Sequence, residues 1–132
     1  GDGASDACVA WGGALAVLDS AGINAEAASL LPTGRTAYIA MRNHSVGVSR
    51  AYRWDGRTAD TTIMPEDLWC GVLDADAAAR LANLSDPHPP ACPTPRSTLG
   101  YSNWGVCEPD NAGCVEGCVA VGSDGLWADV DC

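Results

Sequence analysis

The last third of the sequence carries acidic residues whose order along the chain could bring several carboxylates together. Glu108 and Asp110 are separated by one proline, and Glu116 and Asp129 follow further along the chain. Carboxylates from separate loops supply both the charge and the oxygen ligands, roughly six to eight at roughly 2.3–2.6 Å, that Ca²⁺ prefers. Taken singly, each of these residues is better explained as a solvated surface acid. Only the four together point to a cation site.

The overall charge favours a small cationic partner and argues against two classes of macromolecule. The 132 residues include 17 acidic side chains against seven Arg and no Lys, which gives a net charge of −10. Such a surface repels nucleic-acid phosphates and anionic lipid headgroups. No apolar stretch approaches the roughly 20 residues needed to cross a bilayer. We therefore expect no nucleic-acid binding and no membrane insertion by this segment.

Other metal-binding or catalytic chemistries find little support. Seven cysteines and two histidines could suggest zinc, but no Cys-x2-Cys pair is present. His44 and His88 fall in a turn and a proline-rich loop, and there is no Gly-x-Ser-x-Gly motif for a serine nucleophile. We therefore expect no enzymatic activity.

The cysteine content indicates an oxidising compartment. Seven cysteines in 132 residues is dense for a cytosolic protein and ordinary for a secreted domain held by disulfides. Asn43 and Asn83 each begin an Asn-x-Ser sequon and are predicted glycosylation sites. We therefore predict an extracellular domain, either secreted or part of a cell-surface protein.

Spacing and capping signals predict the elements that must position these residues. A helix is expected over residues 5–11 and a second from Asn24 to Leu31, with Asn24 as its N-cap. Trp11, Trp54 and Trp127 are predicted to fill the core. Strands rich in β-branched and aromatic residues are predicted over residues 36–41, 48–54 and 118–121, and a strand or extended turn over residues 14–18.

Residues 57–100 differ in character from the rest of the chain. Five of the eight prolines fall between Pro87 and Pro95, and a short helix is predicted over residues 74–84 between Cys70 and Cys92. The length of the chain fits one domain. We interpret residues 57–100 as an inserted, disulfide-containing lobe within a single domain over residues 1–132.

Five motifs, in this order, resemble those of the C-type lectin-like domain and cover the chain except residues 57–100. Upstream, Cys8 with Gly12-Gly13-Ala14-Leu15 is similar to the first-helix cysteine and its Gly-Gly-x-Leu. Tyr38-Ile39-Ala40-Met41 stands where the family has Trp-Ile-Gly-Leu, and Trp54-Asp55-Gly56 where it has a Trp-x-Asp-Gly turn. Downstream are Glu108-Pro109-Asp110, Glu116 ahead of Cys118-Val119, and Trp127-Ala128-Asp129 ahead of Cys132.

The resemblance implies an α+β fold with two helices, short antiparallel sheets and a long loop region, and a domain that binds one Ca²⁺. In the family Pro109 would follow a cis peptide bond, and a second calcium position would need acids at Asn111 and Gly117. One calcium is therefore expected. The implied calcium ligands are Glu108, Asp110, Glu116 and Asp129, of which Glu108, Asp110 and Glu116 would also bind carbohydrate.

Two departures from the family pattern bear on sugar binding. Asp110 and Ala128 replace two side-chain amides, and an ionised carboxylate only accepts hydrogen bonds, so both amide donors are lost. Each lost charge-assisted bond is worth roughly 1.5–3 kcal/mol, enough to weaken monosaccharide affinity about tenfold or more. We expect calcium-dependent carbohydrate recognition. The alternative is a disulfide-stabilised module that binds an extracellular protein, or assembles an extracellular structure, without binding sugar.

The resemblance also bears on the cysteines. It pairs Cys118 with Cys132, and it pairs Cys8 with a cysteine on a closing strand downstream of Cys132, so we expect that partner and the terminal strands to lie outside this chain. The remaining four cysteines leave several connectivities open. Cys107 could pair with Cys114 around Glu108 and Cys70 with Cys92 around the predicted helix, or the pairs could be exchanged, as in Cys92 with Cys107.

Overall fold

The computed structural model describes residues 2–43, 51–56, 61–63, 68–69, 72–73 and 96–132. The predicted helix over residues 74–84, both Cys70 and Cys92, and the predicted glycosylation site Asn83 lie outside these residues. Among the described helices, none has the length and apolar character needed to span a membrane.

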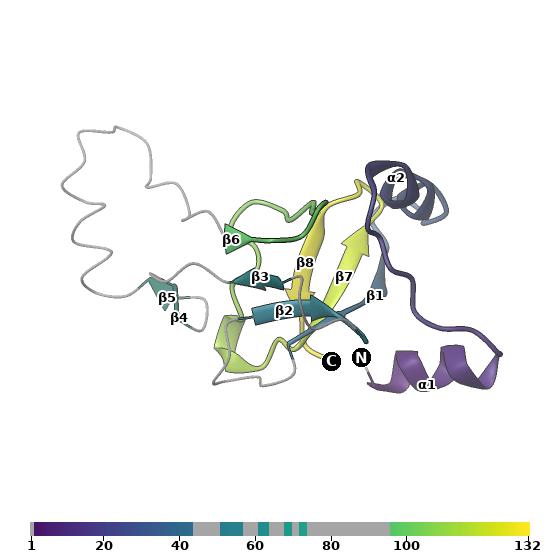
Figure 1. Cartoon of the computed structure of the whole chain (residues 1–132), viewed down its shortest axis with the longest axis horizontal. Coiled ribbons are helices and arrows are strands. Elements are labelled where there is room, and N and C mark those ends of the chain that lie inside the picture. The colour runs from purple at the N-terminus through teal and green to yellow at the C-terminus, as the bar shows by residue number, and fades with distance from the viewer. Residues whose placement is uncertain (1, 44–50, 57–60, 64–67, 70–71, 74–95) are drawn as a thin grey trace.

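An antiparallel sheet of six strands, in the order β6-β3-β2-β1-β7-β8, forms the centre of the described structure (Figure 1). The predicted strands over residues 36–41 and 48–54 correspond to β1 and β2, which pair with each other. The strands are β1 (Thr36–Arg42), β2 (Ala51–Trp54), β3 (Thr61–Ile63), β6 (Arg96–Ser97), β7 (Cys118–Gly122) and β8 (Trp127–Val130), with a separate pair β4 (Leu68–Trp69) and β5 (Val72–Leu73).

The two ends of the segment over residues 57–100 belong to the main sheet. Strand β3 pairs antiparallel with β6, so that Thr62 lies opposite Ser97. The chain therefore leaves the sheet after β3 and returns beside the same strand.

Strands β7 and β8 show why the acidic end of the molecule is well defined. Val119 lies opposite Asp129, and Val121 lies opposite Trp127. Because side chains alternate between the faces of a strand, these four residues share the core face. Asp129 is thereby carried into the interior by the same register that buries Trp127.

The core is built around the aromatic ring of Trp127. Trp54, Tyr101 and Trp104 each meet this ring edge to face, with centroids 5.6–5.8 Å apart, a favourable aromatic arrangement. The predicted burial of Trp54 and Trp127 is confirmed, but that of Trp11 is wrong, since its side chain is 93% exposed. Trp11 follows helix α1 (Asp2–Ala10), which extends away from the sheet instead of packing on it (Figure 1).

The second helix begins earlier than predicted. Helix α2 spans Ala21–Ser29, and its N-cap is Ser20, whose hydroxyl accepts the Ile23 N–H at 3.2 Å. Asn24 lies inside this helix and is buried, so the prediction that it caps the helix is wrong. Its side chain instead donates to the Gly125 carbonyl at 2.9 Å and accepts the indole N–H of Trp127 at 2.7 Å.

The stretch over residues 14–18 forms no strand. It runs as an extended connection in which the Ala16 carbonyl accepts the Ala40 N–H at 2.8 Å. Leu18, at its end, is fully buried in the core. The connection thus joins α1 to the body of the domain.

Candidate calcium site

The loop before β7 holds the first acidic residues in a compact conformation. The Glu108–Pro109 peptide bond is cis, as the resemblance implied, and Pro109 is buried. Asn111 has a φ of 50°, a left-handed conformation that Asn tolerates better than most residues because its short side chain can bond locally. That side chain accepts the Glu116 N–H at 3.1 Å, which closes the loop.

Three carboxylates from two separate segments converge at this loop. Glu108 and Asp110 come from the loop and Asp129 from β8, and one oxygen of each lies within 4.8 Å of the others. Asp129 is buried, with 2% of its surface exposed, and the two loop residues are half-buried. The structure therefore brings together three of the four predicted ligands.

Glu116 lies beside this group without being part of it. Its Oε2 accepts the Ala112 N–H at 2.9 Å, and the same N–H lies 3.1 Å from Oδ1 of Asp110. The carboxylates of Glu116 and Asp110 are thus neighbours around one backbone donor. Whether Glu116 is a ligand stays a prediction.

Asp129 is the hub of the hydrogen bonds at the site. Its Oδ1 accepts the Asp110 N–H at 3.0 Å, and its Oδ2 accepts the Asn111 N–H at 2.6 Å. Oδ2 also accepts the hydroxyl of Tyr52 from strand β2. The sequence analysis missed Tyr52, because an aromatic residue in a strand pattern indicates core packing and carries no signal of a polar role.

Burial and mutual repulsion make the acidic cluster costly to ionise. Burial, followed by the Asp129 and Asp110 carboxylates, raises the pKa of Glu108 to about 9. Burial also raises the pKa of Glu116 to about 7, with a further contribution from Asp129 and an opposing one from the Ala112 N–H. Burial and the Asp129 charge raise the pKa of the Tyr52 hydroxyl well above its usual value, so that it remains a donor.

The residues present fit a hard divalent cation. Oε2 of Glu108 is buried and has no hydrogen-bond partner in the part of the chain that the structure describes. A buried carboxylate oxygen without a donor is unfavourable, and a cation among these side chains would satisfy it. The clustered oxygens all come from carboxylates, which suit Ca²⁺ better than softer metals.

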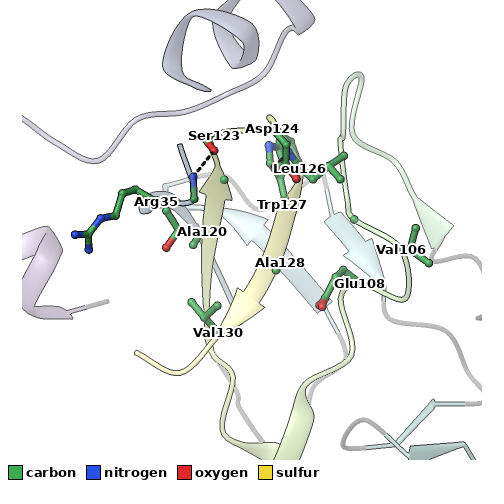
Figure 2. Close-up of a pocket in the computed structure, with 14 residues that line it drawn as sticks. Arg35, Val106, Glu108, Ala120, Ser123, Asp124, Leu126, Trp127, Ala128 and Val130 are labelled. Atoms are coloured by element: carbon green, nitrogen blue, oxygen red, sulfur yellow. Dashed lines mark hydrogen bonds between the residues drawn. The ribbon is translucent and has the colours of Figure 1, made fainter. Parts of the chain in front are cut away.

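A groove of about 420 Å³ adjoins Glu108 on the outer face of β7 and β8 (Figure 2). Its lining includes Ala128 and Val130 from β8, with Val106 and Leu126 contributing apolar side chains. Figure 2 shows Glu108 beside β8, near Ala128. The position where the family pattern has an amide therefore presents only a methyl group to this groove.

The disulfide predicted between Cys118 and Cys132 is confirmed, and it links the start of β7 to the residues after β8. Cys107 and Cys114 also take part in disulfides, and Cys8 is a free cysteine.

Asn43 is buried, with 4% of its surface exposed, and its N–H donates to the Gly117 carbonyl at 2.8 Å. A glycan must project from its asparagine into solvent, so this burial argues against the predicted glycosylation at Asn43.

Similar solved structures share this architecture, whereas no family model matches the sequence. The cow C-type carbohydrate-recognition domain of CD23, determined in the presence of a GlcNAc2Man3 oligosaccharide, has a TM-score of 0.57 and 22% identity, over 98% of this chain and 67% of that one. The mouse scavenger receptor C-type lectin carbohydrate-recognition domain has a TM-score of 0.56 and 16% identity, over 99% and 72%. A calcium-independent type II antifreeze protein has a TM-score of 0.56 and 17% identity, over 99% and 68%.

Proposed function

We propose that this chain, which has the α+β C-type lectin-like fold, is an extracellular recognition domain that binds one Ca²⁺ and, through it, carbohydrate. The observation that carries the proposal is the convergence of Glu108, Asp110 and Asp129 within 4.8 Å of one another. The unpartnered buried oxygen of Glu108 supports it, because that oxygen lacks any donor among the described residues. The Cys118–Cys132 disulfide supports an extracellular location.

The hydrogen bonds assign distinct roles to the acidic side chains. Oδ2 of Asp129 accepts two donors, whereas Oδ1 accepts only the Asp110 N–H among the bonds observed. A carboxylate oxygen has about two lone-pair sites, so Oδ1 is the oxygen of Asp129 left for a cation. Glu108 and Asp110 would complete the cluster, and Glu116 would join it from beside Asp110.

Carbohydrate recognition would rest on the same carboxylates. Bound calcium would supply coordination positions that sugar hydroxyls can take in place of water. Glu108, Asp110 and Glu116 would then accept the protons of those hydroxyls, since ionised carboxylates are acceptors only. With Ala128 beside them, the sugar oxygens would find no amide donor from that position.

Two measurements test the proposal in sequence. Titration with calcium by calorimetry should show one binding event. A glycan array probed with and without chelator should then show binding that requires calcium. Absence of a calcium-binding signal would overturn the proposal at its first step.

The second candidate is a module that binds an extracellular protein or assembles an extracellular structure. The groove beside Glu108 favours it, because its Val106 and Leu126 side chains are exposed and apolar. Calcium binding without any glycan on the array would favour this candidate. Binding of glycan that chelator abolishes would exclude it as the main role.

A further inference from the structure

Tyr52 occupies a rigid position between the core and the acidic centre. Its side chain is fully buried, and its ring meets Trp104 edge to face with centroids 5.8 Å apart. Strand β2, which carries it, is held on both sides by β1 and β3. The hydroxyl is therefore presented from a fixed backbone and a packed ring.

The hydroxyl joins the two segments that flank the acidic centre. It donates to Oδ2 of Asp129, 77 residues away, and the carbonyl of Glu116 lies 2.8 Å from the same oxygen as a second acceptor. Asp129 belongs to β8, and Glu116 immediately precedes β7. One side chain from the core thus contacts both of the segments that carry these acidic residues.

The contact decides which oxygen of Asp129 is available. With the Asn111 N–H at 2.6 Å and the Tyr52 hydroxyl, both lone-pair sites of Oδ2 are used. Oδ1 accepts the Asp110 N–H at 3.0 Å and keeps one site. The three donors hold the carboxylate by both of its oxygens, so it cannot rotate without breaking them.

We propose that Tyr52 is a positioning residue of the acidic centre: its hydroxyl fixes the Asp129 carboxylate so that Oδ1 alone is available to a cation. This inference rests on the proposed calcium site, and it adds a residue that does not itself touch the ion. Partners of this kind orient metal ligands, and their removal typically lowers metal affinity about 10- to 100-fold.

The test compares Tyr52→Phe with the unmodified chain. Phe keeps the ring packing against Trp104 and removes only the hydroxyl. In chelator, we expect the backbone amides of Asp110 and Asn111, which donate to Asp129, to exchange with deuterium faster in the variant, while amides of the β1–β7 ladder keep their rates. In calcium titrations, we expect the dissociation constant to rise about tenfold or more.

Tyr38→Phe is the matched control. The Tyr38 hydroxyl donates to the Asp131 carbonyl at 3.0 Å and contacts none of the clustered carboxylates. This variant should leave both readouts unchanged.

Unchanged exchange at Asp110 and Asn111 in Tyr52→Phe would overturn the inference, as would faster exchange with an unaltered calcium affinity. A uniform increase across the whole sheet would also overturn it, because that is the result of general destabilisation. If the unmodified chain binds no calcium, the proposed function fails, and the inference fails with it as a statement about a cation. Site-specific faster exchange would in that case still show that Tyr52 orders the loop, which separates the two failures.

Discussion

The backbone N–H of Asn111 donates to Oδ2 of Asp129 at 2.6 Å, across 18 residues of sequence. This bond ties the loop that follows Pro109 to strand β8, and the Asp110 N–H bonds to the other oxygen of the same carboxylate. One side chain is thus both a structural acceptor and a candidate cation ligand. Substitutions at the site should therefore have effects on stability that can be separated from effects on calcium.

Asp129→Ala should destabilise the domain and also abolish its calcium response. The change removes the acceptor of two backbone N–H groups and of the Tyr52 hydroxyl. Unpaired buried donors cost about 1–3 kcal/mol each, so we expect a loss of about 3 kcal/mol or more in chelator. Thermal unfolding with and without calcium measures both effects.

Asp131→Ala is the control, since Asp131 is an exposed acid two residues further along the same segment. It should keep the calcium-dependent rise in melting temperature. Retention of that rise in Asp129→Ala would contradict the assigned role of Asp129.

The stability of the calcium-free domain should fall as pH rises from about 5 to about 9. The pKa values of Glu108 and Glu116, about 9 and about 7, lie above their ordinary value of 4.5. The stability that these groups contribute is therefore fully present below about pH 4.5 and is lost as pH rises through about 7 and then about 9. Melting temperatures in chelator across this range test the sign, and a rise with pH would refute it.

Calcium affinity should change with pH in the opposite sense. Because Ca²⁺ binds ionised carboxylates, it must displace the protons that Glu108 and Glu116 hold. Affinity should therefore increase between about pH 5 and pH 9, with protons released on binding. Calorimetry in buffers of different ionisation enthalpy counts these protons, and Glu108→Gln should release fewer.

Restoring the two missing amides should strengthen sugar binding. In the double variant Asp110→Asn with Ala128→Asn, donors return at both positions, and Ala128 borders an open groove that can admit the larger side chain. We expect monosaccharide affinity to rise about tenfold or more, provided calcium is present. Titration with monosaccharides measures it, and Ala25→Asn on the exposed face of α2 is the control.

Asn24→Ala should destabilise the fold without altering the acidic centre. The variant leaves the indole N–H of Trp127 and the Asn24 contact to the Gly125 carbonyl without their amide partner. We expect a loss of about 2–4 kcal/mol, which lowers the melting temperature by about 10 °C. Denaturation curves measure it. Glu26→Ala, an exposed change on the same helix, should have little effect.

Local patterns were sufficient for the strands and for the order of the site. The alternation in residues 36–41 and 118–121 predicted β1 and β7, because a half-buried strand repeats every two residues. The spacing of Glu108, Asp110 and Asp129 identified three carboxylates that the structure brings together. In such cases the informative residues lie within one element or match a motif of fixed spacing.

The tertiary structure alone decided the roles of Asn24, Tyr52 and Asn43. Asn24 contacts Trp127 across 103 residues, and Tyr52 contacts Asp129 across 77. A polar residue at a helix start and a sequon in a turn are local signals, and each was overridden when packing buried the side chain. Trp11 was overridden the opposite way, because α1 lies away from the sheet. The sequence by itself thus determined which elements form and which acids belong together, and only the packing of those elements settled which polar groups are buried as partners.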